Sequence, residues 1–156
     1  MSEDTEELYS LLVPLTDMRL IVPRVCVAEV TGLGQLQMLS DAPDWLVGMV
    51  GWKEISLPLV SFEAAVGGQS PEIGGRTRAV IFHAASISKG GYFAIMSQGL
   101  PQLVRINRDV VEPDDSEDWP ESAPMICRVR MVNEYPVVPD LDRLETMLGE
   151  ASANWA

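Results

Sequence analysis

Apolar residues alternate with polar ones along much of this chain, at the period of two that is typical of β-strands. Turn-forming residues recur about every ten positions between the alternating segments. The segments with strand character are 8–15, 18–22, 55–62, 79–82, 92–96, 98–106, 125–132 and 135–139. This pattern predicts a mainly β fold of many short strands, as in small β-barrels.

Helical signals are few and short. Asp140 is a suitable N-cap for a C-terminal helix whose apolar stripe is Leu141, Leu144 and Leu148. A proline followed by mixed residues at 23–26 predicts one helical turn between two strands. We therefore expect short helices among the strands and one longer helix near the C-terminus.

The central stretch 41–62 carries the strongest local signals in the chain. It predicts a short helical turn that Asp41 caps and Gly48 ends, because these residue types favour the two helix termini. A strand, a tight turn at 51–54 and a second strand should follow. Pro58 cannot donate a backbone hydrogen bond, so we expect it at a sheet edge or a bulge.

Three segments lack regular periodicity and predict loops, namely 31–40, 67–75 and 112–124. The glycines of 67–75 lack the following Lys-Ser or Lys-Thr of a phosphate-binding loop, so no nucleotide site is expected there. Segment 112–124 has six acidic residues, no basic residue and three prolines, a composition that cannot hold one conformation alone. Within it, Trp119 either anchors a partner or packs back onto the protein.

Composition narrows the class of protein. With 156 residues, 47% of them hydrophobic, the chain is expected to form one globular domain. Its formal net charge of −12 repels phosphate groups, so nucleic acid is not an expected partner. The excess acid fits a basic protein face, or serves solubility alone. The acidic N-terminus and the absence of a long apolar run predict a cytoplasmic protein without membrane insertion.

Residues suited to catalysis are sparse. His83 is the only histidine, and no acidic or cysteine neighbours in the sequence suggest a metal site or a nucleophile–base pair around it. Cys26 and Cys127 are predicted to be free thiols, with a disulfide as the minor alternative. Asp114 and Asp115 lie in a loop that lacks the enclosure carboxylate catalysis needs. We therefore expect no enzymatic activity, no cofactor and no metal.

The central stretch resembles the most characteristic motif of the CheW-like domain family. That motif is a small helix, an aromatic residue, Gly, two apolar residues, Asn-Leu-Arg-Gly and an apolar strand containing proline. The matching residues here are Trp45, Gly48, Met49, Val50 and the strand segment Leu57-Pro58-Leu59. The tetrapeptide at 51–54 departs from the family, because Gly-Trp-Lys-Glu stands in place of Asn-Leu-Arg-Gly.

The resemblance covers 8–148, with 1–7 and 149–156 as expected flexible tails. Val27, Glu29 and Val30 match a Val-x-Glu-apolar segment of the family, and the final strand pair followed by Asp-Leu matches its ending. For the fold, the resemblance implies two small five-strand β-barrels that share an apolar groove, with short helices and a C-terminal helix.

For function, the resemblance implies a scaffold that performs no chemistry. CheW-like proteins couple chemoreceptor tips to a CheA-like histidine autokinase, whose regulatory domain they bind. The partner-binding residues implied here are Glu29, Val47, Met49, Trp52, Lys53, Glu54 and Ile55. An exposed tryptophan in the turn would offer a partner a rigid apolar contact.

The resemblance also implies an ion pair between Glu29 and Lys53. Lysine lacks the planar fork of the arginine usual in the family, so the pair should be looser than a bidentate one. Two alternatives remain: both side chains are ordinary solvated charges, and Trp52 belongs to the core rather than to the surface.

The altered turn and the acidic composition resemble the auxiliary CheW-like proteins of pili chemosensory systems, such as ChpC. This implies an adaptor in an array that controls type IV pili twitching motility. The alternative from another class is a small β-barrel ligand-binding protein that uses its apolar groove. The ligand carrier predicts a sizeable apolar cavity, whereas the adaptor predicts a shallow groove.

Overall fold

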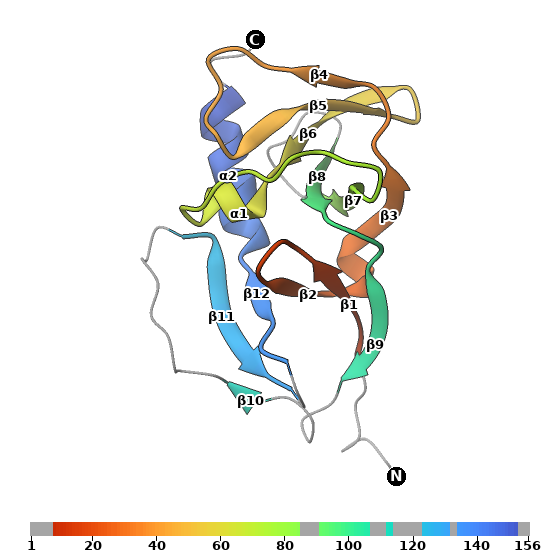
Figure 1. Ribbon diagram of the computed structural model, residues 1–156, viewed down its shortest axis with the longest axis vertical. Coiled ribbons are helices and arrows are strands. Elements are labelled where there is room, and N and C mark those ends of the chain that lie inside the picture. Colours follow the sequence, from red (N-terminus) through yellow and green to blue (C-terminus); the bar gives the residue numbers. More distant parts are fainter. Residues whose placement is uncertain (1–7, 85–90, 107–111, 114–122, 132–133, 153–156) are drawn as a thin grey trace.

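The computed structural model describes residues 8–84, 91–106, 112–113, 123–131 and 134–152. They form two β-sheets that lie one above the other in Figure 1, with α2 beside them. The mainly β fold and its two β units are therefore confirmed. Each unit is an open sheet rather than a closed barrel. Each has six strands instead of five, because β4 and β10 add to the strands that the sequence predicts.

The first sheet takes its strands from both ends of the chain, in the order β10-β11-β12-β2-β1-β9. These strands are β1 (Leu8–Pro14), β2 (Arg19–Pro23), β9 (Gln102–Ile106), β10 (Glu112–Pro113), β11 (Met125–Arg130) and β12 (Val137–Pro139). The predicted N-terminal hairpin is confirmed, since β1 and β2 pair antiparallel around the turn at Thr16 and Asp17. The Leu15 N–H donates to the Met18 carbonyl at 2.9 Å and closes that turn.

The second sheet is built from one continuous stretch of chain, in the order β3-β7-β8-β6-β5-β4. Its strands are β3 (Val27–Gly32), β4 (Leu36–Met38), β5 (Leu46–Trp52), β6 (Ile55–Val60), β7 (Arg78–His83) and β8 (Tyr92–Ser97). A 3₁₀ turn at Arg24–Cys26 joins the two sheets, where the sequence predicts a helical turn. The short helix α1 (Phe62–Ala65) follows β6, and Ser61 caps it.

Two predictions between 31 and 48 are wrong. Part of the expected loop 31–40 is β4, which pairs with β5. In place of the expected helical turn, the Leu46 N–H donates to the Pro43 carbonyl at 3.0 Å in a single turn that leads into β5. Asp41 has a positive φ of 62° instead of the extended backbone of an N-cap. Gly48 lies within β5, where an added Cβ would collide with the Gln37 carbonyl oxygen. Close approach of two strands, not a helix end, therefore requires this glycine.

Pro58 lies in β6 opposite Met49 of β5. Although β6 is an inner strand of the sheet, its pairing with β8 comprises only Leu59 and Val60. Pro58 therefore lies where β6 is paired with β5 alone, as a residue of an edge strand would be. This position is consistent with the expectation of an edge or a bulge.

The main core lies between the two sheets. Strands β7 and β8 are buried on both faces, so they contribute to this core and to a second one. Val80 and Phe82 of β7 face this shared core, whereas Ala79 and Ile81 face a second core inside the upper sheet. This double burial explains why 79–82 is apolar at every position. The rings of Phe82 and Phe93 stack in the shared core with centroids 5.3 Å apart.

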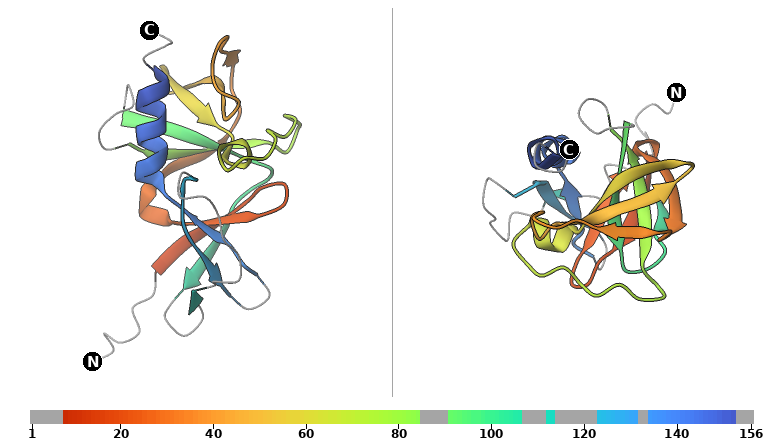
Figure 2. Two further views of the ribbon diagram at one scale, coloured as in Figure 1. Left: turned by 90° about the vertical axis from the view of Figure 1, so that its left-hand side faces the viewer. Right: turned by 90° about the horizontal axis from the view of Figure 1, so that it is seen from above.

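Helix α2 (Leu141–Ser152) lies along one side of the upper sheet, as Figure 2 shows. The Asp140 carboxylate accepts the Arg143 N–H at 3.0 Å, so its predicted capping role is confirmed. Leu144 and Leu148 are buried in the shared core. The helix continues beyond Leu148, where the sequence predicts a loose tail, and Ala151 is buried as well. Residues 1–7, 153–156 and Trp119 lie outside the described part of the chain.

Candidate functional site

The hairpin between β5 and β6 forms the centre of the candidate site. Trp52 and Ile55 are directly paired across the hairpin, so Lys53 and Glu54 make a two-residue turn. Their φ angles are 47° and 67°, as in the type I′ turns that suit the twist of a hairpin. A side chain in this left-handed region costs roughly 1–2 kcal/mol, and Asn-Gly is the usual solution.

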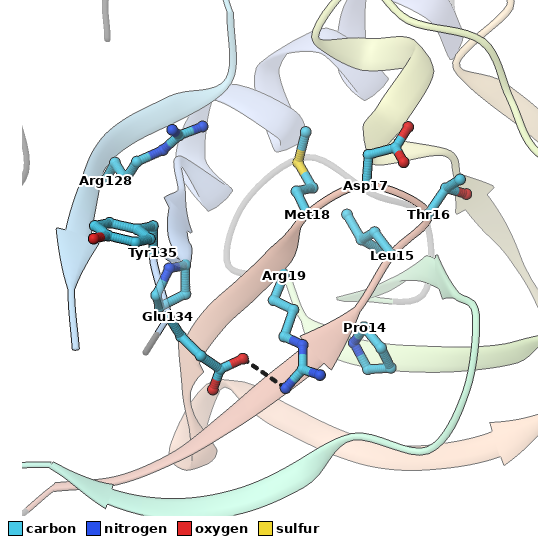
Figure 3. A pocket seen from close by; sticks show the side chains of 10 residues that line it. Pro14, Leu15, Thr16, Asp17, Met18, Arg19, Arg128, Glu134 and Tyr135 are labelled. Carbon is cyan, nitrogen blue, oxygen red and sulfur yellow. Dashed lines mark ion pairs between the residues drawn. The ribbon is translucent and has the colours of Figure 1, made fainter. Parts of the chain in front are cut away.

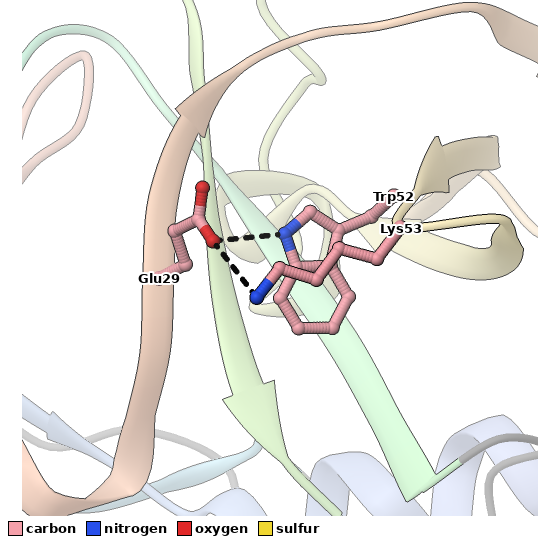
Figure 4. Close-up of polar contacts among 3 residues, drawn as sticks. All are labelled: Glu29, Trp52 and Lys53. Carbon is pink, nitrogen blue, oxygen red and sulfur yellow. Dashed lines mark hydrogen bonds and ion pairs between the residues drawn. The ribbon is translucent and has the colours of Figure 1, made fainter.

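The Trp52 indole reaches from β5 across the upper sheet to β3. Its Nε1–H donates to Oε1 of Glu29 on β3 at 3.2 Å, although β3 and β5 are not neighbours in the sheet. Its ring meets that of Tyr92 edge to face, with centroids 4.9 Å apart and an interplanar angle of 65°. Figure 4 shows the indole lying between β3 and its own hairpin. Trp52 is thus half-buried, and both sequence alternatives for it are partly correct.

Lys53 lies over the same indole and completes a small cluster with Glu29. Its Nζ is 4.9 Å from the centre of the Trp52 ring and 3.8 Å from Glu29 Oε1. The predicted Glu29–Lys53 pair is therefore present. The side chains of Lys53 and Glu29 are 70% and 42% exposed, so the pair contributes only about 0–1 kcal/mol to stability. The pair places a cation and a carboxylate beside an aromatic face.

The structure does not place all seven predicted partner-binding residues on one surface. Glu29, Trp52, Lys53 and Ile55 come together, and Glu54 is exposed beside them in the turn. Val47 is only 8% exposed and packs in the core of the upper sheet, so it offers a partner little surface.

Met49 lies apart from this cluster, on the other face of β5. It is half-buried and lines a shallow cavity of about 490 Å³ with Leu36, Gly51 and Ser56. Alternation along the strand explains the separation, because the pairs Val50–Leu57 and Trp52–Ile55 face the core of the upper sheet.

Tyr92 belongs to the site but is absent from the sequence prediction. It starts β8, and its ring lies between those of Trp52 and His83, 5.6 Å from the latter. No local pattern marks this residue, because its position depends on how β8, β6 and β5 are ordered. His83 is exposed at the end of β7.

The described residues contain little that suggests chemistry. Cys26 and Cys127 are free and partly buried, and desolvation raises the pKa of both thiols. A raised pKa opposes formation of the reactive thiolate. Within the described ranges, no group of three His, Cys, Asp or Glu residues lies close enough to hold a metal ion.

A cavity of about 700 Å³ lies between the β1–β2 turn, β11 and residues 134–136 before β12 (Figure 3). Charged side chains line it, including Asp17, Arg19, Arg128 and Glu134, and Arg19 and Glu134 form an ion pair at 2.7 Å. The interior of the upper sheet is filled by apolar side chains such as Leu57 and Leu59. These features do not favour the ligand-carrier alternative, which needs a sizeable apolar cavity.

The fold and the site together define a class: a mainly β module of two sheets with a shared core and one charged, aromatic surface hairpin. The family model described as CheW-like domain matches residues 10–144, which is most of the chain. The chain belongs to the CheW-like domain family, so the resemblance seen in the sequence is confirmed at the level of the family. Non-enzymatic scaffolding in chemotaxis signalling is the function of that family, and it supports the predicted class of function in kind.

One solved structure with the same fold is the scaffolding protein TtCheW from Thermoanaerobacter tengcongensis. The two structures have a TM-score of 0.73 over 90% of this chain and 89% of TtCheW, at 11% sequence identity. At that identity the likeness concerns the fold alone. No curated protein matches the sequence. None of the described helices has both the length and the apolar character needed to cross a membrane.

Proposed function

We propose that this protein is a non-enzymatic adaptor that couples chemoreceptor tips to the regulatory domain of a CheA-like histidine kinase. The observation that carries the proposal is the cluster of Trp52, Lys53 and Glu29 at the hairpin that corresponds to the family motif. It offers a partner an aromatic surface flanked by fixed charges of both signs, and aromatic anchors with polar rims are typical of protein interfaces.

The geometry favours docking because the cluster is arranged before a partner arrives. The indole is fixed by its hydrogen bond to Glu29 and by the edge of Tyr92, so little conformational entropy remains to be lost on binding. Lys53 and Glu54 remain exposed in the turn and can select partners by charge.

At a finer level, we infer that this adaptor serves a cytoplasmic array, and that the array controls type IV pili twitching motility. Support comes from the acidic chain and from the Gly-Trp-Lys-Glu turn, which resemble the auxiliary proteins of pili chemosensory systems. Deletion of the gene in its host should reduce the spread of twitching colonies, and restoring Trp52→Ala in place of the wild type should not rescue it. Full rescue by that variant would contradict the role of the turn.

The decisive measurement is binding of the full chain to purified fragments of a receptor tip and of a kinase regulatory domain. We expect Lys53→Glu to weaken at least one of these interactions about tenfold or more, because it reverses a charge at a fixed position. Trp52→Ala should do the same by removing the aromatic anchor. Tyr135→Ala is the matched control, since it removes an exposed aromatic ring from the connection between β11 and β12, away from the hairpin.

Unchanged binding in both Lys53→Glu and Trp52→Ala would exclude this hairpin as the contact surface. Failure of the wild type to bind either fragment would count against the adaptor role itself. Trp52→Phe distinguishes the aromatic contact from the hydrogen bond, because it keeps an aromatic ring and removes the N–H that donates to Glu29.

A further inference from the structure

Glu63 is a buried acidic residue that the candidate site does not use. It lies in the first turn of α1 and is only 7% exposed. Its Oε2 accepts the N–H of Thr16 at 2.9 Å, which connects α1 to the β1–β2 turn of the other sheet. Its Oε1 is buried and has no hydrogen-bond donor among the described residues. A buried carboxylate oxygen without a partner is costly, so such an atom points to a missing donor.

A cavity of about 510 Å³ lies against this carboxylate. The β1–β2 turn forms one wall with Thr16, Asp17 and Met18, and Glu63, Val66 and 68–72 form the other. Asp17 and Glu72 add two exposed carboxylates, and the lining contains no Lys, Arg or His. In Figure 3 the carboxylate of Asp17 points away from the Arg19–Glu134 ion pair, so that pair does not neutralise it.

The chemistry of this lining selects the occupant. A multivalent metal ion is disfavoured, because no three His, Cys, Asp or Glu side chains among the described residues lie close enough together to hold one. A phosphate or carboxylate group would be repelled by the three acids. A guanidinium group fits, because it is a flat cation with five donors and is more weakly hydrated than an ammonium group.

We propose that this cavity receives an arginine side chain from a partner protein. The guanidinium pairs with the carboxylate of Glu63, whose buried Oε1 lacks a donor, and the carboxylates of Asp17 and Glu72 in the same lining add negative charge to the cavity. The net charge of −12 on the whole chain attracts a basic partner surface toward this position.

This arginine site is separate from the hairpin of the proposed function. The hairpin precedes β6 and α1 follows it, so the two surfaces lie at opposite ends of one strand. The proposal therefore does not depend on which partner the hairpin binds. A partner that contacts both surfaces would bind the hairpin of the upper sheet and also the cavity to which the β1–β2 turn of the lower sheet contributes.

The test uses the full-length ¹⁵N-labelled protein and the blocked tripeptide acetyl-Gly-Arg-Gly-amide as the probe. We expect saturable shifts of the amide signals of Thr16, Val66 and Gly68 as the peptide is added. The same peptide with citrulline in place of arginine, which has the shape but not the charge, should bind at least about tenfold more weakly.

Glu63→Gln should weaken the arginine peptide by a similar factor, while its amide oxygen still accepts the N–H of Thr16. Glu54→Gln is the matched control, because it removes one charge from the exposed turn at the other end of β6 and should leave peptide binding unchanged. No saturable shift with the arginine peptide, or equal binding of the citrulline peptide, would overturn the proposal. The citrulline comparison uses the wild-type protein, so it decides the question even if Glu63→Gln misfolds.

Discussion

At the scale of single residues, the β5–β6 turn combines a strained backbone with an ordered cluster of side chains. Lys53 and Glu54 both have positive φ angles, although glycine or asparagine suits such positions better. The same turn brings Lys53 over the Trp52 ring and close to Glu29. The protein therefore keeps charged residues in the turn at a cost in stability, as expected where side chains serve binding.

Glu54→Gly should stabilise the protein by about 0.5–1 kcal/mol. Glycine adopts the positive φ of 67° without strain, and this gain exceeds the extra entropy it gives to the unfolded chain. Urea unfolding followed by circular dichroism measures the change. Glu54→Ala is the control, because it removes the same charge but retains a Cβ, so it should not stabilise. Equal stabilisation by alanine would show that charge, rather than backbone strain, dominates at this position.

The sequence could supply part of this residue-level description. The Glu29–Lys53 pair was predictable only through the family resemblance, because the two residues lie on strands that are not adjacent in the sheet. The indole hydrogen bond and the role of Tyr92 could not be predicted, since both depend on how the upper sheet curves. The burial of Val47 could not be predicted from alternation, because the pairing register of β5 shifts between Leu46 and Gly48.

At the scale of elements, most strands were predictable from alternation, and β4 was not. Residues 36–38 are too few to show a period, and β4 exists through its pairing with β5. The hairpin β1–β2 and helix α2 were predictable because local signals sufficed: alternation around a turn, and a capped apolar stripe. The false helical turn at 41–48 arose because Gly48 was interpreted as a helix end.

Gly48→Ala should destabilise the protein by about 1–3 kcal/mol, since its Cβ would displace β4 from β5 at the Gln37 carbonyl. Gly32→Ala provides the control, because no atom lies within 4 Å of an added Cβ at the end of β3. We expect the control to have nearly wild-type stability in the same urea titration. A neutral Gly48→Ala would mean that β4 can shift outward without loss.

Trp52→Phe should lower the free energy of unfolding by about 1 kcal/mol and increase amide hydrogen exchange in β3. The phenyl ring cannot donate to Glu29, so the link between β3 and the β5–β6 hairpin is lost. Glu29→Gln retains an acceptor and loses only an exposed ion pair, so its effect should be smaller. If Glu29→Gln were the more damaging change, the ion pair would matter more than the indole.

At the scale of the whole molecule, the two sheets share one core and should unfold together. Phe82 and Phe93 of the upper sheet are fully buried beside Val13 and Leu20 of the lower sheet. Helix α2 contributes Leu144 to the same core. The largest core therefore belongs to both sheets, although the upper sheet also has a second core of its own, and a single domain is the expected unit of folding.

Phe82→Ala should destabilise the protein by about 3–5 kcal/mol, because it opens a cavity in the core that both sheets share. Unfolding followed by near-ultraviolet and far-ultraviolet circular dichroism should give coincident single transitions. Tyr135→Ala, at an exposed position, should change stability by less than about 0.5 kcal/mol. Two separate transitions would show that the sheets are independent units.

The order of strands has a consequence for synthesis on the ribosome. The upper sheet is drawn from 27–97 without interruption, so all its strands are available once Ser97 has left the exit tunnel. The β1–β2 hairpin emerges first but must wait for β9 on one side and β12 on the other. During that interval both of its edges are open to pairing with other nascent chains. Chaperones that bind the hairpin during this interval would prevent its open edges from pairing with other nascent chains.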